Sequence, residues 1–198
     1  MKIKLCGVRT VNDALLCAEA GADEIGVIFA AQSKRRVNVE TARAIREALP
    51  AAIPVVGVFK DTTLDEVLRT VFEAGLQAAQ LHGTWHAGAD LPLYAALQVT
   101  GEDALQPRPG AARVLLDGPA GGSGVPFAWS LAEKARALFS GVPLFISGGL
   151  TPGNVAQAIA QARPSGVDVA SGIENETGFK DLAKVRAFVR AARNTDFK

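Results

Sequence analysis

Eight short apolar runs, most of them followed by a segment with helical spacing, limit the fold of this 198-residue chain more than any other feature. Strands that alternate with helices predict a parallel sheet, because each helix carries the chain back to the edge where the next strand starts. Eight such units close into a (β/α)8 barrel, whereas five or six favour an open doubly wound sheet. The predicted strands span residues 3–6, 24–29, 53–59, 78–81, 97–100, 113–116, 144–146 and 167–170.

We therefore expect one compact α/β domain, a (β/α)8 TIM barrel over residues 1–198. The length is at the low end for this fold, so trimmed helices are expected. Residues 102–111 hold two prolines and a glycine. They leave little room for a helix between the fifth and sixth strands, and a loop is predicted in its place. Helical spacing predicts helices over residues 11–18, 39–49, 63–74, 129–139, 152–163 and 181–192, and at best a short one over 88–96.

The charge balance excludes several classes of protein. Lys and Arg total 21 and Asp and Glu total 20, which gives no electrostatic argument for binding nucleic acid or an anionic membrane. No apolar run approaches the ~20 residues of a membrane span. The N-terminal residues lack the apolar segment of a signal peptide, so a cytoplasmic enzyme is expected. Cys6 and Cys17 have no paired spacing such as C-x-x-C, so neither a metal site nor a disulfide is expected.

Small residues follow the last two predicted strands. Gly148 and Gly149 come after the seventh strand, and Ser171 and Gly172 come after the eighth. Glycine at a strand end lets backbone N–H groups approach an anion, and a following helix adds the positive end of its dipole. In (β/α)8 barrels the phosphate site commonly lies after strands seven and eight. The two turns together predict a phosphate site, although either alone also fits a tight turn with no ligand.

Chemically active side chains lie at other strand ends. Cys6 ends the first strand, His82 follows the fourth, Asp117 follows the sixth and Asp168 lies inside the eighth. Catalytic residues of such barrels lie at this edge, and a thiol and a carboxylate on opposite sides can divide base and acid duties. Structural alternatives stay open: a buried inert thiol, a carboxylate that caps a turn, a hydrogen-bonded histidine and an ion-paired aspartate.

A series of motifs runs in order through nearly the whole chain. Singly they are weak signals, but together they are specific. They include KLCG at 4–7, GVIF at 26–29, SKRRV at 33–37, QLHG at 80–83, LD at 116–117, GGSG at 121–124, SGGLTPGNV at 147–155, VDVASGIE at 167–174 and GFKD at 178–181. With these motifs the chain resembles the phosphoribosylanthranilate isomerase family of tryptophan biosynthesis.

The resemblance implies an Amadori rearrangement of a phosphorylated aminoaldose, N-(5′-phosphoribosyl)anthranilate, without cofactor or metal. By their places in the motifs, Cys6 is similar to the family's general base, Asp117 to its general acid and Arg35 to the residue that binds the anthranilate carboxylate. His82 and Asp168 are expected to contact the substrate. The expected phosphate-binding residues are Gly122, Gly148, Gly149, Ser171 and Gly172.

Two departures from the family pattern affect the anthranilate end and the acid loop. Residues 30–32 are Ala-Ala-Gln where the family usually has an aromatic residue, a proline and a lysine, and only three residues separate Asp117 from the glycines at 121–122. Other phosphate-binding barrels stay open as alternatives: a sugar-phosphate epimerase, an indole-forming lyase or a non-catalytic phosphometabolite-binding barrel. An epimerase usually needs a metal, and the chain has two histidines. Monomer and homodimer are both compatible with the sequence.

Overall fold

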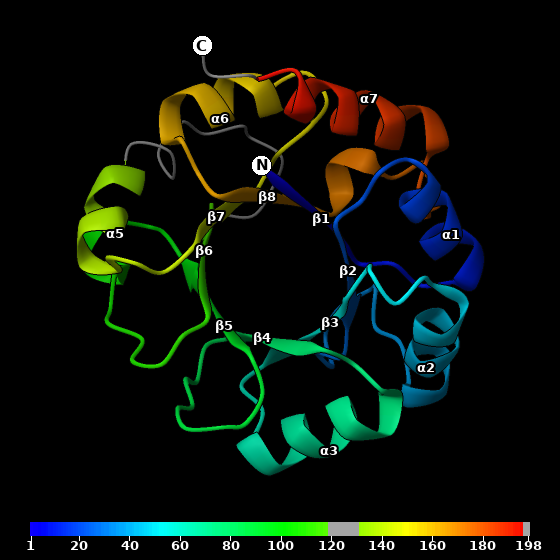
Figure 1. The fold of residues 1–198 in the computed structure, drawn as a ribbon, viewed down its shortest axis with the longest axis horizontal. Helices are drawn as coiled ribbons and strands as arrows, with labels where there is room; N and C mark the ends of the chain where they lie inside the picture. The colour runs from blue at the N-terminus through cyan, green and yellow to red at the C-terminus, as the bar shows by residue number, and fades with distance from the viewer. Residues whose placement is uncertain (119–130, 196–198) are drawn as a thin grey trace.

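The computed structural model describes residues 1–118 and 131–195, and in it eight parallel strands close into a barrel in the order β1 to β8. The helices form an outer ring around the strands (Figure 1). The strands are β1 (Lys2–Cys6), β2 (Glu24–Ile28), β3 (Val55–Lys60), β4 (Ala78–His82), β5 (Leu93–Gln98), β6 (Arg113–Asp117), β7 (Leu144–Ser147) and β8 (Gly166–Val169). The predicted (β/α)8 architecture is confirmed.

Four of the six described α-helices start where a polar side chain caps the first turn. Thr10, Asn38, Thr63 and Asp181 each accept a hydrogen bond from the backbone N–H three residues later, which satisfies a donor that the helix leaves free. The α-helices are α1 (Val11–Glu19), α2 (Val39–Ala48), α3 (Leu64–Ala74), α5 (Ala132–Leu138), α6 (Val155–Ala162) and α7 (Leu182–Arg193). Single 3₁₀ turns occur at η1 (Glu102–Ala104) and η2 (Ser171–Ile173).

The fifth strand differs from its prediction. A short helix over residues 88–96 was expected, but Leu93–Gln98 is strand β5, paired with β4 and β6. Leu93, Ala95 and Leu97 are buried on alternate positions, which is the two-residue period of a strand. Two alanines and three leucines in residues 91–97 hide that period, because both types favour helices. The predicted loop between β5 and β6 is confirmed, with η1 as its one helical turn among the described residues.

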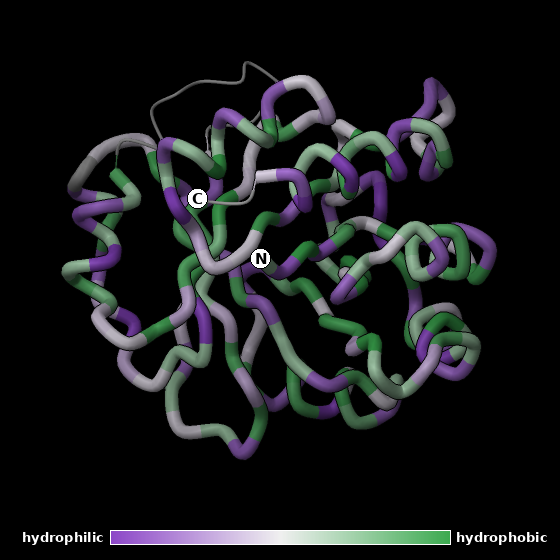
Figure 2. The backbone as a smooth tube through the Cα atoms, turned by 45° about the horizontal axis from the view of Figure 1, so that its top comes forward, coloured by the Kyte–Doolittle hydropathy of each residue, from purple (hydrophilic) through white to green (hydrophobic). Residues whose placement is uncertain are grey.

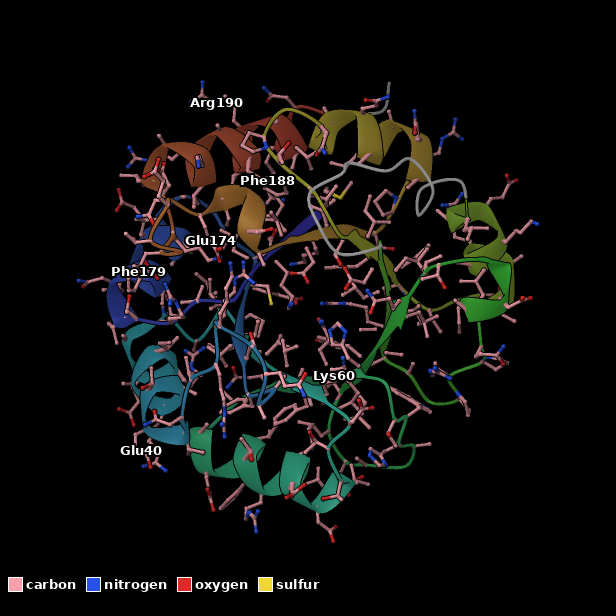
Figure 3. The ribbon with its side chains drawn as sticks, turned by 180° about the vertical axis from the view of Figure 1, so that it is seen from behind. Glu40, Lys60, Glu174, Phe179, Phe188 and Arg190 are labelled. Atoms are coloured by element: carbon pink, nitrogen blue, oxygen red, sulfur yellow. The ribbon has the colours of Figure 1, made fainter. Side chains whose placement is uncertain are left out.

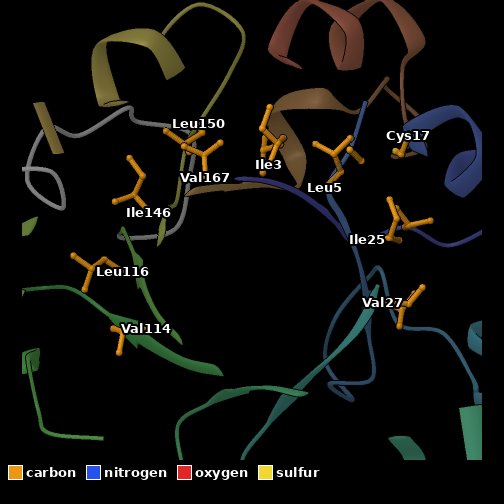
Figure 4. Close-up of a cluster of buried hydrophobic side chains, with 14 of the residues drawn as sticks. Ile3, Leu5, Cys17, Ile25, Val27, Val114, Leu116, Ile146, Leu150 and Val167 are labelled. Carbon is orange, nitrogen blue, oxygen red and sulfur yellow. The ribbon is translucent and has the colours of Figure 1, made fainter. Parts of the chain in front are cut away.

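The main hydrophobic core lies between the outer faces of the strands and the helices. Figure 4 shows Ile3, Leu5 and Val167 pointing away from the barrel centre, and all three are fully buried. Figure 2 shows hydrophobic segments along the strands and polar ones on the outer helices. Burial of this kind stabilises a fold by roughly 25 cal/mol per Å² of apolar surface. The main core thus lies outside the strands, while the inside of the barrel holds polar side chains and a small apolar cluster of Ala96, Leu115 and Phe145.

The amino-terminal end of the barrel is filled by a charged pair. Arg113 of β6 and Glu24 of β2 lie on opposite sides of the barrel and form two hydrogen bonds of 2.6 Å each. The guanidinium of Arg113 lies 4.0 Å from the ring centroid of Tyr94 and 3.9 Å from that of Phe145. These contacts fill the amino-terminal end, or bottom, of the barrel.

Closure of the barrel joins the two ends of the described chain. β1 pairs with both β2 and β8, and this register places Lys4 opposite Glu24 on one side and Asp168 on the other. Arg193 at the end of α7 donates a 2.5 Å hydrogen bond to the Met1 carbonyl oxygen. Within the described ranges, none of the helices combines the length and the apolar character that crossing a membrane requires.

Candidate active site

A cavity of about 570 Å³ opens at the carboxyl ends of the strands. Eight of the ten residues predicted for the site line it: Cys6, Arg35, His82, Asp117, Gly148, Gly149, Asp168 and Ser171. Gly172 follows Ser171 in η2 but is not part of the lining, and Gly122 lies outside the described residues. The predicted thiol, carboxylates, histidine and arginine therefore meet in one place.

Cys6 ends β1 with its thiol in the cavity wall and 5 % of the residue exposed. Burial raises the pKa of the Cys6 thiol, and the positive charge of Lys4 is the largest opposing influence. The other cysteine, Cys17, lies on α1 in the outer core, where burial raises its pKa to about 12. Only Cys6 therefore combines access to the cavity with a nearby positive charge.

Asp117 ends β6 on another side of the same cavity. Burial raises the pKa of its carboxyl, although a hydrogen bond from Ser147 acts against this. The Ser147 hydroxyl donates to Asp117 Oδ1 over 2.5 Å, which fixes the carboxyl against the end of β7. A carboxyl with a raised pKa holds its proton more readily near neutral pH and suits a general acid.

Asp168 lies inside β8, where it both faces the cavity and forms an ion pair. It lines the cavity, and its Oδ1 accepts a 3.0 Å hydrogen bond from the Lys4 ammonium. Both residues are buried, with 1 % of Lys4 and 6 % of Asp168 exposed. The burial of Lys4 alone would lower its pKa, but the Asp168 carboxylate raises it, so the ammonium keeps its proton.

Arg35 reaches the cavity from the loop after β2 and is held by Glu174. Its Nε donates to Glu174 Oε1 over 2.5 Å, and its Nη2 donates to Oε2 over 2.7 Å. The Lys180 ammonium also donates to Glu174 Oε1, over 3.2 Å. Burial would raise the pKa of Glu174, but the hydrogen bond from Arg35 and the charge of Lys180 lower it on balance. Glu174 is therefore an anion that fixes one edge of the guanidinium.

The carboxylate that fixes Arg35 comes from the far end of the chain. Figure 3 shows Glu174 closer to the barrel centre than Glu40 and Arg190, which lie on the outer helices. Among the described residues, Nη1 of Arg35 has no hydrogen-bond partner, so this nitrogen is free to bind an anion in the cavity.

His82 closes the cavity on the β4 side. Its Nε2 lies 2.9 Å from Gln80 Nε2, and because the amide nitrogen can only donate, the imidazole nitrogen accepts and the proton sits on Nδ1. Burial lowers the pKa of His82 to about 4, and the positive charges of Lys4 and Lys60 add to this. His82 is therefore neutral near pH 7 and offers an N–H donor.

The two predicted turns pack against each other. A side-chain carbon at Gly172 would overlap the Leu150 carbonyl oxygen, so only glycine lets η2 approach the loop after β7 this closely. The Asn154 side-chain amide donates to the Gly149 carbonyl oxygen over 2.9 Å and holds the same loop to the start of α6. The ends of β7 and β8 thus form one concave wall of small residues beside the cavity.

Comparisons with known proteins agree with this geometry. The family model described as N-(5'phosphoribosyl)anthranilate (PRA) isomerase matches residues 3–191. The chain belongs to this family. It is 44 % identical over 207 residues to N-(5′-phosphoribosyl)anthranilate isomerase of Myxococcus xanthus, covering 98 % of this chain and 97 % of the relative.

Solved structures of the isomerase family have the same fold. The crystal structure of phosphoribosyl anthranilate isomerase from Thermotoga maritima matches with a TM-score of 0.88 at 34 % identity, covering 98 % of this chain and 99 % of the other. A second isomerase structure is a complex with reduced 1-(o-carboxyphenylamino)-1-deoxyribulose 5-phosphate. It matches with a TM-score of 0.85 at 33 % identity, over 98 % and 99 % of the two chains.

Several residues that shape the site of this family member were not singled out from its sequence. They are Lys4, Gln80, Ser147, Glu174 and Lys180. Each stands inside one of the sequence motifs, so a signal was present, but the motif does not say which partner the side chain binds. Among the residues that the structure describes, there is no cluster of three or more His, Cys, Asp or Glu side chains that could hold a metal ion.

Proposed function

We propose that this chain catalyses the Amadori rearrangement of N-(5′-phosphoribosyl)anthranilate to 1-(2-carboxyphenylamino)-1-deoxyribulose 5-phosphate. The observation that carries the proposal is the placement of Cys6 at the end of β1 and Asp117 at the end of β6, in the wall of one cavity. Strands one and six approach that cavity from different sides of the closed barrel. The reaction needs a proton delivered at one point of a small substrate and another removed at a second point, and two such residues supply this.

Asp117 is the proposed general acid. Its carboxyl, with its pKa raised by burial, donates a proton to the ring oxygen of the furanose. The bond between that oxygen and C1′ breaks, and the electron pair of the substrate nitrogen forms the C1′=N bond of a Schiff base. The nitrogen of the substrate is the electron sink, so the chemistry draws on no cofactor.

Cys6 is the proposed general base. Its thiolate removes the proton from C2′, and the electrons of that C–H bond form the C1′=C2′ bond of an enolamine as the nitrogen regains its electron pair. Tautomerisation of the enol at C2′ then gives the aminoketose. The thiolate is the form that accepts the proton, so the charges around Cys6 determine how much of the enzyme is active.

The two anionic ends of the substrate match two parts of the cavity. Arg35 binds the anthranilate carboxylate through its free edge, because Glu174 already occupies Nε and Nη2. Backbone N–H groups of the turns at Gly148–Gly149 and Ser171–Gly172 hold the phosphate, with Gly122 as a further expected contact. His82 and Asp168 lie between these ends and contact the sugar.

Turnover of synthetic N-(5′-phosphoribosyl)anthranilate by the purified protein tests this function. We expect the aminoketose as the sole product, with activity unaffected by a metal chelator. Binding without turnover would instead indicate a non-catalytic phosphometabolite-binding barrel. Release of indole-glycerol phosphate would indicate a lyase, and activity lost to the chelator would indicate an epimerase-like enzyme.

A further inference from the structure

Lys4 is a buried charge to which the proposed mechanism gives no part. It is the largest side chain among those that are essentially fully buried, with 1 % exposed. Lysine is rarely buried to this degree, because removing an ammonium from water costs several kcal/mol unless it is paired. A hydrophobic residue at this position in the middle of β1 would avoid that cost. Packing alone therefore does not explain the presence of a cation at this position.

The geometry directs this cation at the thiol. Lys4 and Cys6 are two residues apart on β1, so both side chains point into the barrel. They converge over Gly26 of β2, which pairs with Cys6. A side-chain carbon at Gly26 would lie 2.7 Å from Cys6 Sγ and 3.1 Å from Lys4 Nζ. The absence of a side chain at Gly26 thus creates the space in which the sulfur and the ammonium meet.

Other charges face the same point from every element that packs there. Asp168 of β8 pairs with Lys4, and Glu24 of β2 adds a second negative charge near the ammonium. Lys180, between η2 and α7, and Arg35, after β2, are the other cations that act on Cys6. Lys180 and Arg35 are both already hydrogen-bonded to Glu174, whereas the Lys4 ammonium donates to Asp168 and also hydrogen-bonds with Cys6.

We propose that Lys4 is a positioning residue that holds a positive charge against Cys6 and favours the thiolate form of its sulfur, with Asp168 fixing the ammonium in place. The proposal rests on the role of Cys6 as the base. Lys4 does not exchange its proton with the substrate; it acts through the charge that it keeps throughout the cycle. An opposite charge within about 4–6 Å shifts a pKa by about one to three pH units, which offsets the effect of burial on the thiol.

Alkylation of Cys6 tests the proposal without any substrate. In a Cys17→Ala background Cys6 is the sole thiol, since the chain has two cysteines. The rate of its reaction with iodoacetamide as a function of pH then gives the pKa of Cys6 directly. We expect Lys4→Met to raise that pKa by about one to three pH units, and the alkylation rate at pH 7 to fall by at least about tenfold.

Lys2→Met is the matched control. Lys2 lies two residues earlier on β1, but 63 % of its side chain is exposed and its ammonium pairs with Asp23 over 3.7 Å. This variant should leave the alkylation profile unchanged. In Lys4→Met, kcat/KM should be lower near pH 7 and return toward the wild-type value as the pH passes the new pKa. If Lys4 only stabilised the fold, the decrease in kcat/KM would not be reversed at high pH.

A second pair of variants keeps the test decisive if Lys4→Met does not fold. Asp168→Asn removes the negative charge but keeps the size of the side chain, so it should lower the pKa of Cys6. Adding Lys4→Met to Asp168→Asn leaves no unpaired buried charge and should raise the pKa again. An unchanged Cys6 pKa in either folded Lys4 variant, verified by circular dichroism, would overturn the proposal. Because alkylation needs no turnover, this result is independent of whether the proposed reaction is correct.

Discussion

The two ends of the barrel bury charged groups in different ways. At the amino-terminal end, Glu24 and Arg113 share two hydrogen bonds, and aromatic rings cover both faces of the guanidinium. At the carboxyl-terminal end, Cys6, Asp117 and His82 are largely withdrawn from water, and within residues 1–118 and 131–195 none of the three forms a salt bridge.

This difference distinguishes charged groups that stabilise the fold from titratable groups that are suited to acid–base chemistry. A buried ion pair such as Glu24–Arg113 holds its protonation state and is costly to break, although Nε of Arg113 has no hydrogen-bond partner among the described residues. A buried group without such a partner shifts its pKa, and shifted pKa values are what acid–base chemistry uses. The Lys4–Asp168 pair belongs to both kinds, since it is an ion pair like Glu24–Arg113 and its Asp168 carboxylate lines the cavity.

The largest expected effect is on the proposed acid and base. Removing a positioned acid or base usually lowers the rate by about 10²–10⁴. Cys6→Ala and Asp117→Asn should therefore each lower kcat at least about a hundredfold, with KM and the circular dichroism spectrum largely unchanged, in a steady-state assay with the synthetic substrate. Cys17→Ala should leave kcat near wild type. A folded Cys6→Ala protein with more than about a tenth of the wild-type kcat would remove the thiol from the mechanism.

Breaking the Glu24–Arg113 pair should lower the stability of the protein and leave kcat nearly unchanged. Arg113→Met leaves Glu24 buried without its partner, which typically costs about 3–5 kcal/mol of stability. Urea denaturation should show this loss, while kcat of the folded protein stays near wild type. Adding Glu24→Gln to Arg113→Met should recover part of the stability. A fall in kcat comparable to that of Asp117→Asn would show that the two ends are not separate in function.

Arg35→Ala should have a smaller effect, limited to binding. A hydrogen bond to a charged group contributes roughly 1.5–3 kcal/mol, so KM should rise by about one to two decades. Arg36→Ala, which alters the exposed neighbour, should change KM little. A substrate analogue that lacks the anthranilate carboxylate sharpens the test, because with it Arg35→Ala should behave like wild type. Equal effects of both variants on the natural substrate would mean that the basic loop acts as a whole.

The last expected effect is confined to acid pH and concerns stability. The pKa of His82 is lowered from 6.5 to about 4 in the folded state by burial and by the charges of Lys4 and Lys60. The unfolded chain therefore binds more protons between these values, so stability falls as the pH drops from about 6.5 to about 4. His82→Asn should flatten that part of the curve of unfolding free energy against pH. If the slope is the same in both proteins, His82 is not buried in neutral form.

The sequence predicts the strands well because burial on both faces makes them apolar, and it predicts the catalytic candidates because they stand at strand ends. It does not predict the pairs that orient them. Lys4 and Asp168 are 164 residues apart, and Arg35 and Glu174 are 139 apart. Closure of the barrel between β1 and β8 brings these segments together, and the register places Lys4 directly opposite Asp168. A local sequence pattern predicts neither the closure of the barrel nor the register of its strands.

Strand β5 is also not predictable from local sequence. Its composition favours a helix, but pairing with β4 and β6 makes it a strand. No described α-helix connects β4 to β5 or β5 to β6 (Figure 1). The loops there are joined by the Trp85 indole, which donates to the Pro109 carbonyl oxygen over 3.2 Å. Leu91 and Leu105 from these loops cover the core in place of helices.

Because loops and no described α-helix flank β5 in the sequence, we expect this strand to open locally. A strand covered by loops can separate from its neighbours without unpacking a helix, so the free energy of its opening is below that of global unfolding. The backbone amides of β5 should then exchange their hydrogens with solvent sooner than those of β1, which lies under α1 and α7. The strand expected to open first carries no proposed catalytic group itself, but it pairs with β6, which carries the proposed acid Asp117.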